Sequence, residues 1–447
     1  MSLRRILENY LSQDPVSFHM PGHKHGRDIF HGVDLTTLDW TEVDELDNLH
    51  DAHGAIAMLE ERLSSFWGSF ATKLSVGGST ACNLAGILGS APRGSKVLID
   101  RNAHRSVYNA IRMAELRAEY FYPLTTSKEE WTEFLRRHDD AVLVLWTYPT
   151  YEGICFDLVD QIAQCRSELP HAVTMVDEAH GAHLVLSDSL PTDALRCGAD
   201  VVVQSLHKTL PALTMTSVLH FSREFSSRKP LRFESIRERI DWYLAAIQSS
   251  SPSYILMCSV EEMMDVLEGG FVSVDRWLEE LAYLRSELDR RGLLLSVPGS
   301  RFDPSKILMR CSPQQVSILA REYGIRFELA TDSYALLMVS PSNRRSDSER
   351  LLRAMDALAE FPAPGGGSQL AFSHCRMKPP LRRLESWELI GKPSERVPLR
   401  QALGKIAAQS VIPYPPGIPV VVAGEVFGED EIAFLERCGY TDCVIIS

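Results

Sequence analysis

Short apolar runs alternate with amphipathic helical patterns from about residue 55 to residue 270. The runs expected to form strands lie near Leu74, Val97, Tyr120, Val142, Val173, Val201 and Val218. Helical patterns, for example at residues 107–116 and 158–167, separate these runs. Such alternation is typical of a mostly parallel sheet that is covered by helices on both faces. The sequence therefore predicts an α/β fold around a mostly parallel seven-stranded sheet.

A chain of 447 residues is too long for one compact core, and changes in pattern divide it into several units. We expect an N-terminal arm (1–50), a large domain (51–270), a small α+β domain (271–361), a linker (362–373) and a C-terminal α+β unit (374–447). The arm should hold a helix near residues 3–11, and the small domain should hold helices at 274–290 and 347–358. Strands of the small domain are expected near Ile307 and Leu336. The linker is predicted from its density of Pro and Gly.

A lysine stands directly after one of the predicted strands, in the segment Ser205, Leu206, His207, Lys208. A lysine at the end of a buried strand loses hydration, which lowers its pKa and leaves more of the neutral amine that attacks aldehydes. This is the requirement for a Schiff-base lysine, and pyridoxal phosphate is the usual aldehyde. Ser205 and His207 could bind the phosphate of that cofactor. The plainer alternative is a solvated lysine at a strand end.

Two other strand ends carry groups that suit the same cofactor. Asp177 follows the apolar run 172–176 and could hold a proton on the pyridine nitrogen, which makes the ring an electron sink. His104 follows the predicted strand near Val97 and could lie flat on the ring. The alternatives are a solvated acid and a structural histidine. His180 and His183 suggest a metal site, but no Cys or carboxylate set at ligand spacing accompanies them, so we expect no metal.

A glycine-rich turn precedes these residues in the chain. Gly77 and Gly78, followed by Ser79 and Thr80, connect the predicted strand near Leu74 to a helical pattern. Glycines allow backbone amides to approach an anion, and a helix N-terminus favours negative charge. By itself such a turn is often only a strand–helix connection. In chain order, the four segments are the glycine-rich turn as a phosphate cradle, His104 as the stacking ring, Asp177 as the pyridine carboxylate, and Lys208. Together they predict a pyridoxal phosphate site.

Three further blocks carry a resemblance to a known family. They are P-G-H-K at residues 21–24, D-x-T-E…L-D-x-L at 39–49, and P-Y-P-P-G-I-P at 413–419 with Gly-Glu at 424–425. With the central segments, they resemble the Orn/Lys/Arg decarboxylase family, the prokaryotic basic amino acid decarboxylases of the aspartate-aminotransferase fold. The resemblance spans about residues 15–430. Ala423 and Met215 depart from the family, in which Pro and Gln are frequent there, and the chain is too short for the wing domain of the larger members.

The resemblance implies the type I fold of pyridoxal-phosphate-dependent transferases and assigns roles to the residues above. Catalysis would rest on Lys208, His207, His104 and Asp177. Cofactor contacts would come from Gly78, Ser79, Thr80, His104, Asp177, His180, Ser205, His207 and Lys208. It also implies a homodimer with shared active sites, in which Ser249 and Ser250 reach the phosphate in the neighbouring subunit. An ordinary helix-capping cluster is the alternative for these two serines.

The implied reaction is decarboxylation of a basic amino acid to an amine that feeds polyamine metabolism, with arginine favoured, then lysine, then ornithine. An aminotransferase or aldolase on the same fold is one alternative, because the central residues serve those reactions equally well. A non-catalytic relative is the other, although it would be expected to lack Lys208, Asp177 or the cradle. An aminotransferase would need an arginine for the α-carboxylate, and Arg344 and Arg345 are candidates. The alternative for them is a solvated loop before a helix capped by Ser346 and Asp347.

Composition limits the remaining possibilities. A net charge of −13 argues against a nucleic-acid partner. Nine cysteines without a C-x-x-C pattern indicate free thiols in a reducing compartment. No signal peptide or membrane-spanning run is apparent, so we expect a cytoplasmic protein without a membrane partner. His23 and Lys24 of the P-G-H-K block are either surface charge or groups at the mouth of the active site.

Overall fold

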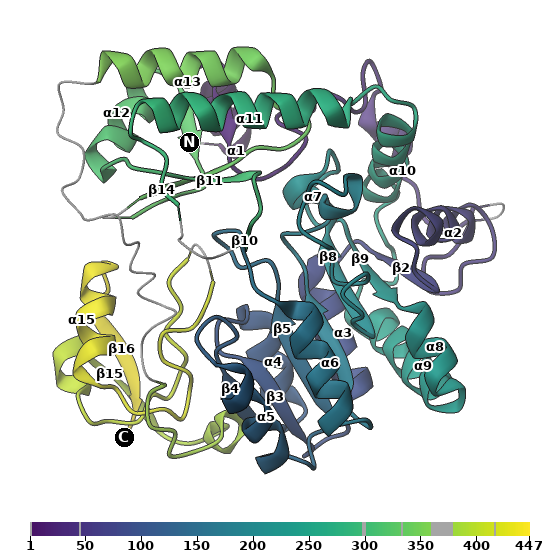
Figure 1. Cartoon of the computed structure of the whole chain (residues 1–447), viewed down its shortest axis with the longest axis vertical. Coiled ribbons are helices and arrows are strands. Elements are labelled where there is room, and N and C mark those ends of the chain that lie inside the picture. The colour runs from purple at the N-terminus through teal and green to yellow at the C-terminus, as the bar shows by residue number, and fades with distance from the viewer. Residues whose placement is uncertain (1, 44–45, 297–300, 332–333, 359–378, 415–416) are drawn as a thin grey trace.

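The computed structural model describes residues 2–43, 46–296, 301–331, 334–358, 379–414 and 417–447. Its centre is a seven-stranded sheet with the order β2-β9-β8-β7-β5-β3-β4 (Figure 1). The strands are β2 (Ala71–Ser75), β3 (Lys96–Asp100), β4 (Arg117–Phe121), β5 (Leu143–Thr147), β7 (Val173–Asp177), β8 (Val201–Ser205) and β9 (Ser217–Phe221). All pairings are parallel except those of β9, which runs antiparallel to β2 and β8. The predicted α/β class and mostly parallel seven-stranded sheet are confirmed.

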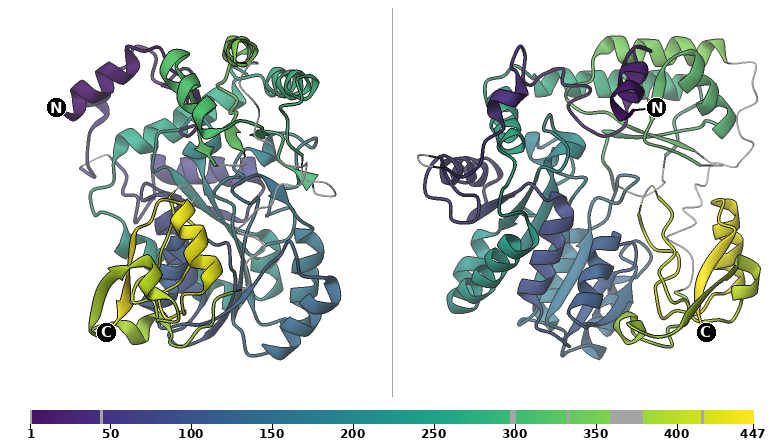
Figure 2. Two further views of the ribbon diagram at one scale, coloured as in Figure 1. Left: turned by 90° about the vertical axis from the view of Figure 1, so that its left-hand side faces the viewer. Right: turned by 180° about the vertical axis from the view of Figure 1, so that it is seen from behind.

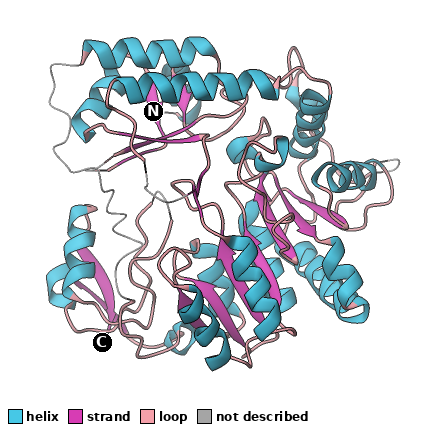
Figure 3. Cartoon of the chain, viewed as in Figure 1, coloured by secondary structure: helices cyan, strands magenta, loops and turns pink. Residues whose placement is uncertain are grey.

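Helices cover both faces of this sheet, as the continuous apolar runs predicted (Figure 3). One face packs against α3 (Gly78–Ser90), α4 (Arg105–Met113) and α9 (Pro230–Ile247), and the other against α5 (Lys128–Arg137) and α6 (Leu158–Glu168). Side chains alternate between the two cores: on β5, Leu143 and Leu145 face the first set, whereas Val144 and Trp146 face the second. The large domain also contains the helices α2 (Ala55–Trp67), α7 (Leu206–Thr209), α8 (Arg223–Arg228) and α10 (Tyr254–Glu268).

The small domain is a three-stranded antiparallel sheet under a layer of helices. Its strands have the order β11-β14-β13 and are β11 (Lys306–Met309), β13 (Leu329–Ala330) and β14 (Ala335–Met338). The helices are α11 (Val274–Arg290), α12 (Pro313–Glu322) and α13 (Arg345–Ala357), and Figure 1 shows α11 and α13 side by side. The predicted helix at 274–290 is confirmed to the residue. The predicted cap at Ser346 is wrong, because Arg344 is the N-cap and its N–H donates to Asp347 Oδ2 at 3.0 Å.

Two short pairings join the units. In the N-terminal arm, α1 (Leu3–Leu11) is followed by β1 (Val16–Phe18), which pairs in parallel with β12 (Ile325–Phe327) of the small domain. Farther along, β6 (Ile154–Cys155) of the large domain pairs with β10 (Arg301–Phe302). The arm is therefore attached to the small domain by backbone hydrogen bonds. The linker expected at 362–373 lies outside the described residues.

The C-terminal unit has its own small core and lies against the edge of the large domain (Figure 2). Its elements are η3 (Ser386–Leu389), β15 (Ser394–Pro398), η4 (Leu399–Ala402), α15 (Glu429–Arg437) and β16 (Asp442–Ile446). The buried Arg101 of the large domain donates to Pro419 O at 2.9 Å and pairs with Glu425 at 3.1 Å. This ion pair fixes the C-terminal unit beside the end of β3. Within the described residues, no helix has the length and apolar character needed to cross a membrane.

Candidate active site

Two adjoining cavities lie at the carboxyl edge of the sheet, where β2, β3, β5, β7 and β8 end. They share Ser79, His104, Tyr151, His180 and Lys208, and the larger has a volume of about 490 Å³. This edge is where open α/β sheets bind ligands. The predicted residues that line one or both cavities are Gly78, Ser79, Thr80, His104, Asp177, His180, His207 and Lys208. The fold thus brings together side chains that are up to 130 positions apart in the sequence.

Lys208 lies in α7, the short helix that follows β8. Its Nζ is 3.2 Å from Nε2 of His180. Burial lowers the pKa of Lys208, while the charges of Asp177 and Glu328 act in the opposite direction. A lowered pKa increases the fraction of neutral amine near pH 7, which is the form that attacks an aldehyde. The geometry is that of a reactive amine, as the strand-end position predicted.

A directed chain of hydrogen bonds connects Asp177 to His104. Asn83 Nδ2 donates to Asp177 Oδ2 at 2.8 Å and to Ser106 Oγ at 3.1 Å. Since Ser106 Oγ accepts from Asn83, its own proton is available for His104 Nδ1 at 2.9 Å. The buried carboxylate also accepts the Ala179 N–H at 3.1 Å, so both oxygens of Asp177 are oriented. These bonds hold a carboxylate and an imidazole ring in a fixed relation.

The His104 ring is neutral and is positioned from behind by the C-terminal unit. Burial lowers the pKa of His104 to about 4. The backbone of Gly417 lies against the ring: a Cβ at residue 417 would be 3.0 Å from His104 Cδ2 and 3.2 Å from Nε2. The Arg105 N–H donates to Gly417 O at 3.1 Å, which fixes this approach. A glycine is needed here because its φ is +90° and because no side chain fits.

The glycine-rich turn forms the N-terminus of α3. Gly78 has a φ of +70° and is the first residue of the helix. Gln248 Oε1 accepts the N–H groups of Val76 and Gly77 at 2.9 and 3.2 Å and so holds the turn in place. The N–H groups of a first helical turn have no intrahelical partners and favour an anion. The turn therefore has the geometry expected of the predicted phosphate cradle, whose role stays a prediction.

Four predicted phosphate contacts differ in how they relate to this cradle. Ser205 is buried and donates to Ser79 Oγ at 2.9 Å, so it supports the cradle from below. His207 Nδ1 donates to Thr216 O at 2.9 Å, and burial lowers the pKa of His207 to about 4. Nε2 of this neutral ring is an acceptor, so His207 can donate to a phosphate only after taking up a proton. Ser249 and Ser250 are exposed and line neither cavity of their own chain.

The residues present fit pyridoxal phosphate. Asp177 offers a buried, oriented carboxylate to a protonated ring nitrogen, and His104 offers a flat neutral ring. Lys208 offers an amine with a lowered pKa. At the N-terminus of α3, Ser79 and Thr80 offer N–H groups to a phosphate, whereas the Gly78 N–H donates to Met215 O at 2.8 Å. The predicted residues that line the two cavities thus lie together, whereas Ser205, Ser249 and Ser250 line neither.

The sequence did not reveal a second group of residues around the same cavity. Lys306, fully buried at the start of β11, has Nζ 2.8 Å from Nδ1 of His180. Glu328 accepts the Tyr151 hydroxyl at 2.7 Å and the Met20 N–H at 3.0 Å. Neither Lys306 nor Glu328 belongs to a local pattern, because each is a single residue beside a short strand of another domain. Tyr151 could have been found, since it lies just beyond a predicted strand end, and Asn83 because it lies in the helix that follows the glycine-rich turn.

The structure shows where Lys24 and Arg345 lie, for which the sequence left two interpretations each. Lys24 is only 1% exposed, and its Nζ donates to His19 O at 2.6 Å and to Met338 O at 3.2 Å. Surface charge is therefore the wrong interpretation of Lys24. Arg345 is exposed, pairs with Glu280 at 3.2 Å and lines neither cavity.

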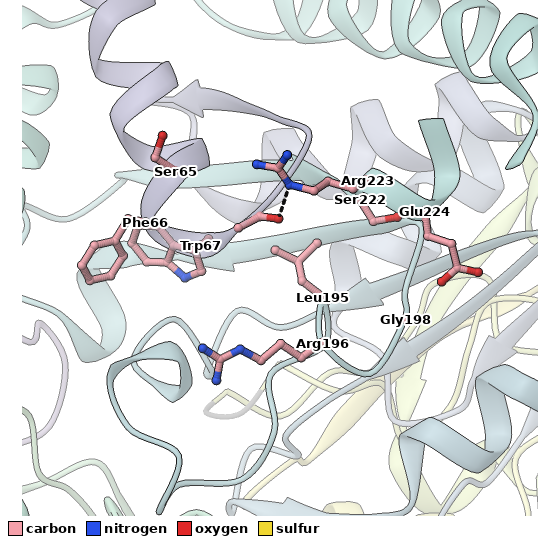
Figure 4. Close-up of a pocket in the computed structure, with 10 residues that line it drawn as sticks. Ser65, Phe66, Trp67, Leu195, Arg196, Gly198, Ser222, Arg223 and Glu224 are labelled. Atoms are coloured by element: carbon pink, nitrogen blue, oxygen red, sulfur yellow. Dashed lines mark hydrogen bonds between the residues drawn. The ribbon is translucent and has the colours of Figure 1, made fainter. Parts of the chain in front are cut away.

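A separate cavity of about 340 Å³ lies at the opposite edge of the sheet, beyond the end of α2 (Figure 4). It is lined by Phe66, Trp67, Arg196 and Arg223, and the dashed line in Figure 4 marks the bond from Arg223 Nε to Gly68 O at 3.1 Å. No predicted site residue lines it. Among the described residues, no group of three or more His, Cys, Asp or Glu is arranged to hold a metal ion.

Comparison with known proteins places the chain among decarboxylases. Residues 2–317 match the family model "Orn/Lys/Arg decarboxylase, major domain", and residues 370–440 match "Orn/Lys/Arg decarboxylase, C-terminal domain". The protein YaaO of Bacillus subtilis is 30% identical over 97% of this chain and 93% of its own length. The arginine decarboxylase of Bacillus subtilis is 27% identical over 96% of this chain and 91% of its own length.

The structural comparison agrees. The Francisella novicida lysine decarboxylase LdcF superimposes with a TM-score of 0.76 at 18% identity, over 95% of this chain and 78% of that protein. This likeness confirms the predicted type I fold of pyridoxal-phosphate-dependent enzymes. The two family models together cover most of the chain, including both the sheet edge and the C-terminal unit. The chain therefore belongs to the Orn/Lys/Arg decarboxylase family, whose members are pyridoxal-phosphate-dependent amino acid decarboxylases.

Proposed function

We propose that this chain decarboxylates a basic amino acid with pyridoxal phosphate and supplies the amine to polyamine metabolism in the cytoplasm. The observation that carries the proposal is the shared cavity of Lys208 and Asp177, an amine of lowered pKa and a buried, oriented carboxylate. The amine would react with the aldehyde of the cofactor, and the carboxylate would pair with its ring nitrogen.

Each residue has a defined task. Pyridoxal phosphate, when bound, supplies the aldehyde that amines attack and a protonated ring that takes up the electrons left by loss of carbon dioxide. Asp177 would hold the ring proton, and the Asn83 amide keeps its carboxylate aligned. His104 would lie against the ring of the bound cofactor and limit its movement, which orients the substrate attached to it. The protein contributes orientation and electrostatics.

The proton for the product carbon most simply comes through Lys208. The substrate amine arrives as an ammonium group and must lose a proton before it can replace Lys208. Lys208 Nζ can carry that proton and return it to Cα after carbon dioxide has left. His207 is the second candidate, but its Nε2 would first have to be protonated, and burial lowers the pKa of His207 to about 4.

Arginine is the preferred substrate in this proposal, followed by lysine and ornithine. Relatives named arginine decarboxylase are 26–27% identical over at least 91% of their length, whereas the constitutive lysine decarboxylase of Escherichia coli is 22% identical over 76%. Glu328 lines the larger cavity and gives it a negative group that favours a cationic side chain. An arginine substrate requires a carboxylate that can meet a planar guanidinium.

Incubation of the purified holoenzyme with arginine, lysine and ornithine tests the proposal directly. Released carbon dioxide is measured, and the amine is identified by mass. Agmatine supports the arginine assignment, and cadaverine or putrescine moves the substrate to lysine or ornithine. Formation of a keto acid without carbon dioxide would show an aminotransferase instead. An absence of any product, with cofactor covalently bound, would favour a non-catalytic relative.

We also propose a homodimer with shared active sites. The exposed Ser249 and Ser250 follow directly on Gln248, whose side chain holds the glycine turn of its own cradle. Ser249 Oγ accepts the Ser251 N–H at 3.2 Å, so this hydroxyl can still donate its own proton to a group of a neighbouring subunit. Subunit exchange between the inactive variants Lys208→Ala and Ser249→Ala/Ser250→Ala should restore activity in the mixed dimer. If the mixture stays inactive although exchange is demonstrated, the serines do not act across the interface.

A further inference from the structure

His180 lies between two lysines. Its Nε2 is 3.2 Å from Lys208 Nζ, and its Nδ1 is 2.8 Å from Lys306 Nζ. The Tyr151 ring packs edge-on against the imidazole, with centroids 5.2 Å apart, so the ring cannot turn freely. The two amines, which come from different domains, are thus connected by the two nitrogens of one ring.

Space for Lys306 is built into the fold. Gly153 has a φ of +97°, and a Cβ there would be 2.7 Å from Cβ and Cγ of the lysine. Lys306 Nζ also lies 5.6 Å from the centre of the Tyr151 ring. The charged groups that act on Lys306 are Asp303, Glu328, Lys208 and Glu152. A buried cation held by an imidazole nitrogen is unusual, because such a lysine normally has a carboxylate partner.

We propose that Lys306 holds a proton in reserve for Lys208 and exchanges it through His180. In the forward step the Lys306 ammonium gives a proton to His180 Nδ1, while His180 Nε2–H gives its proton to Lys208 Nζ. Lys306 becomes a neutral amine, Lys208 becomes an ammonium, and the imidazole changes tautomer but remains neutral. The reverse step restores the first state. No charge is created, and no further reactant is needed.

The electrostatics suit this exchange. Burial and the two lysines lower the pKa of His180 well below its usual value, so the ring stays neutral and can pass protons in either direction. Burial also lowers the pKa of Lys306 to about 8 and that of Lys208 in the same direction. Two buried amines that both have a lowered pKa can exchange a proton, whereas an arginine at position 306 could not release one. Lys208 must be neutral to attack the cofactor and protonated to leave, so a nearby reserve serves both steps.

This inference rests on the proposed role of Lys208, and its first test needs no amino acid substrate. In the cofactor-free full chain, the reactivity of Lys208 toward acetic anhydride is measured against pH by mass spectrometry. Lys306→Met removes a neighbouring positive charge, so Lys208 should hold its proton more tightly and be acetylated about tenfold more slowly near pH 7. Lys306→Arg keeps the charge and should stay within about threefold of the wild type. Lys96→Met, which removes a lysine at the opposite edge of the sheet, is the control.

The second test follows the proton itself. Hydroxylamine captures the cofactor from the holoenzyme, and Lys208 must take up a proton as it leaves. Capture should slow at least about tenfold in Lys306→Met and also in Lys306→Arg, and not in Lys96→Met. In a His180→Gln background, Lys306→Met should add no further slowing, because the connection is already broken. Thermal melting checks that each variant is folded. If neither Lys306 variant folds, the capture rate of the His180→Gln variant by itself tests the inference.

Three results would overturn the inference. Capture at the wild-type rate in Lys306→Arg would show that only the charge matters. Additive slowing in the double variant would show that the proton does not pass through His180. A raised KM for the amino acid, with acetylation and capture unchanged, would make Lys306 a carboxylate anchor. Failure of the decarboxylation assay alone would leave the acetylation and capture results intact.

Discussion

Two walls enclose the active-site cavity, and they differ in how they are built. The sheet wall is formed by the cradle at 77–80, His104, Asp177 and Lys208, all of which follow strand ends of the large domain. The outer wall includes Glu328 of the small domain and Ile418 of the C-terminal unit. Behind it, Lys306 and Gly417 of the same two units contact His180 and His104. The sheet wall carries the groups that would touch the cofactor. The residues of the outer wall orient the side chains of the sheet wall, add charge near them and close the cavity.

The difference shows how one fold divides its tasks. Strand ends of a parallel sheet converge by geometry, so residues placed there meet without further specification. Residues of the outer wall meet the site only after the domains have packed. We therefore expect substitutions in the sheet wall to abolish or strongly reduce catalysis. Substitutions in the outer wall should change reaction rates or the stability of the protein to a smaller extent.

The largest effect is expected for Lys208→Ala. Loss of the only proposed Schiff-base amine should lower activity by at least about 10³-fold, while the protein stays folded. Borohydride reduction and peptide mapping of the wild type should locate the cofactor on Lys208, and the variant should give no adduct. An adduct on another lysine would contradict the assignment of the sheet wall. Lys96→Ala, at the opposite edge of the sheet, should keep full labelling.

The two edges of the same sheet can be compared through two buried carboxylates. Asp177→Asn removes the charge that would hold the ring proton and should reduce kcat by about 10²-fold with cofactor still bound. Asp200, which precedes β8, pairs with Arg166 at 3.2 Å and with Arg228 at 2.8 Å. Asp200→Asn should lower the melting temperature by several degrees and leave kcat within about twofold. Equal losses of kcat in both variants would mean that Asp177 acts only through stability.

A smaller effect is expected for Gly417→Ala in the outer wall. The new methyl group would meet His104 at 3.0 Å and should displace its ring, with a loss of activity of about tenfold. Gly404→Ala is the matched control, because Gly404 has a φ of +73° and no atom within 4 Å of the added Cβ. Both variants should lose about 1 kcal/mol of stability from backbone strain, but only the first should lose activity. Kinetic assays and urea unfolding of both proteins distinguish the two contributions.

The smallest effect on turnover is expected at Lys24, in the N-terminal arm. Burial lowers the pKa of Lys24 from 10.5 to about 7, so between these values the unfolded chain carries a proton that the folded chain has released. The free energy of unfolding should therefore rise with pH across this window, by roughly 3 kcal/mol from Lys24 alone. Lys24→Met should remove that rise, whereas Lys405→Met, at an exposed site, should not. Urea unfolding at several pH values from 7 to 10 measures the difference. A parallel slope in all three proteins would show that folding does not lower the pKa of Lys24.

Much of the large domain could be predicted because its information is local. Most of the seven strands are short, mainly apolar runs. Asp177, His104 and Lys208 stand at or just after the ends of such runs, so the sequence alone places them at one edge of the sheet. The helix cap expected at Ser346 is wrong, although a serine hydroxyl is a good cap. Asp347, at the third helical position, accepts the Arg344 N–H instead. Which of two adjacent polar residues caps a helix depends on how the preceding loop enters it.

The sequence by itself determined the α/β class, the seven strands and the chemical groups of the sheet wall, because strand periodicity and the polarity of strand ends are read within a few residues. Only the tertiary structure decided that Lys306 would reach His180 and that Gly417 would lie against His104. Lys306 is 126 positions from His180, and Gly417 is 313 positions from His104. No local pattern records such a contact, because it exists only when separate domains bury their surfaces against each other. That packing converts a lysine at the start of a small-domain strand into a neighbour of the active-site amine.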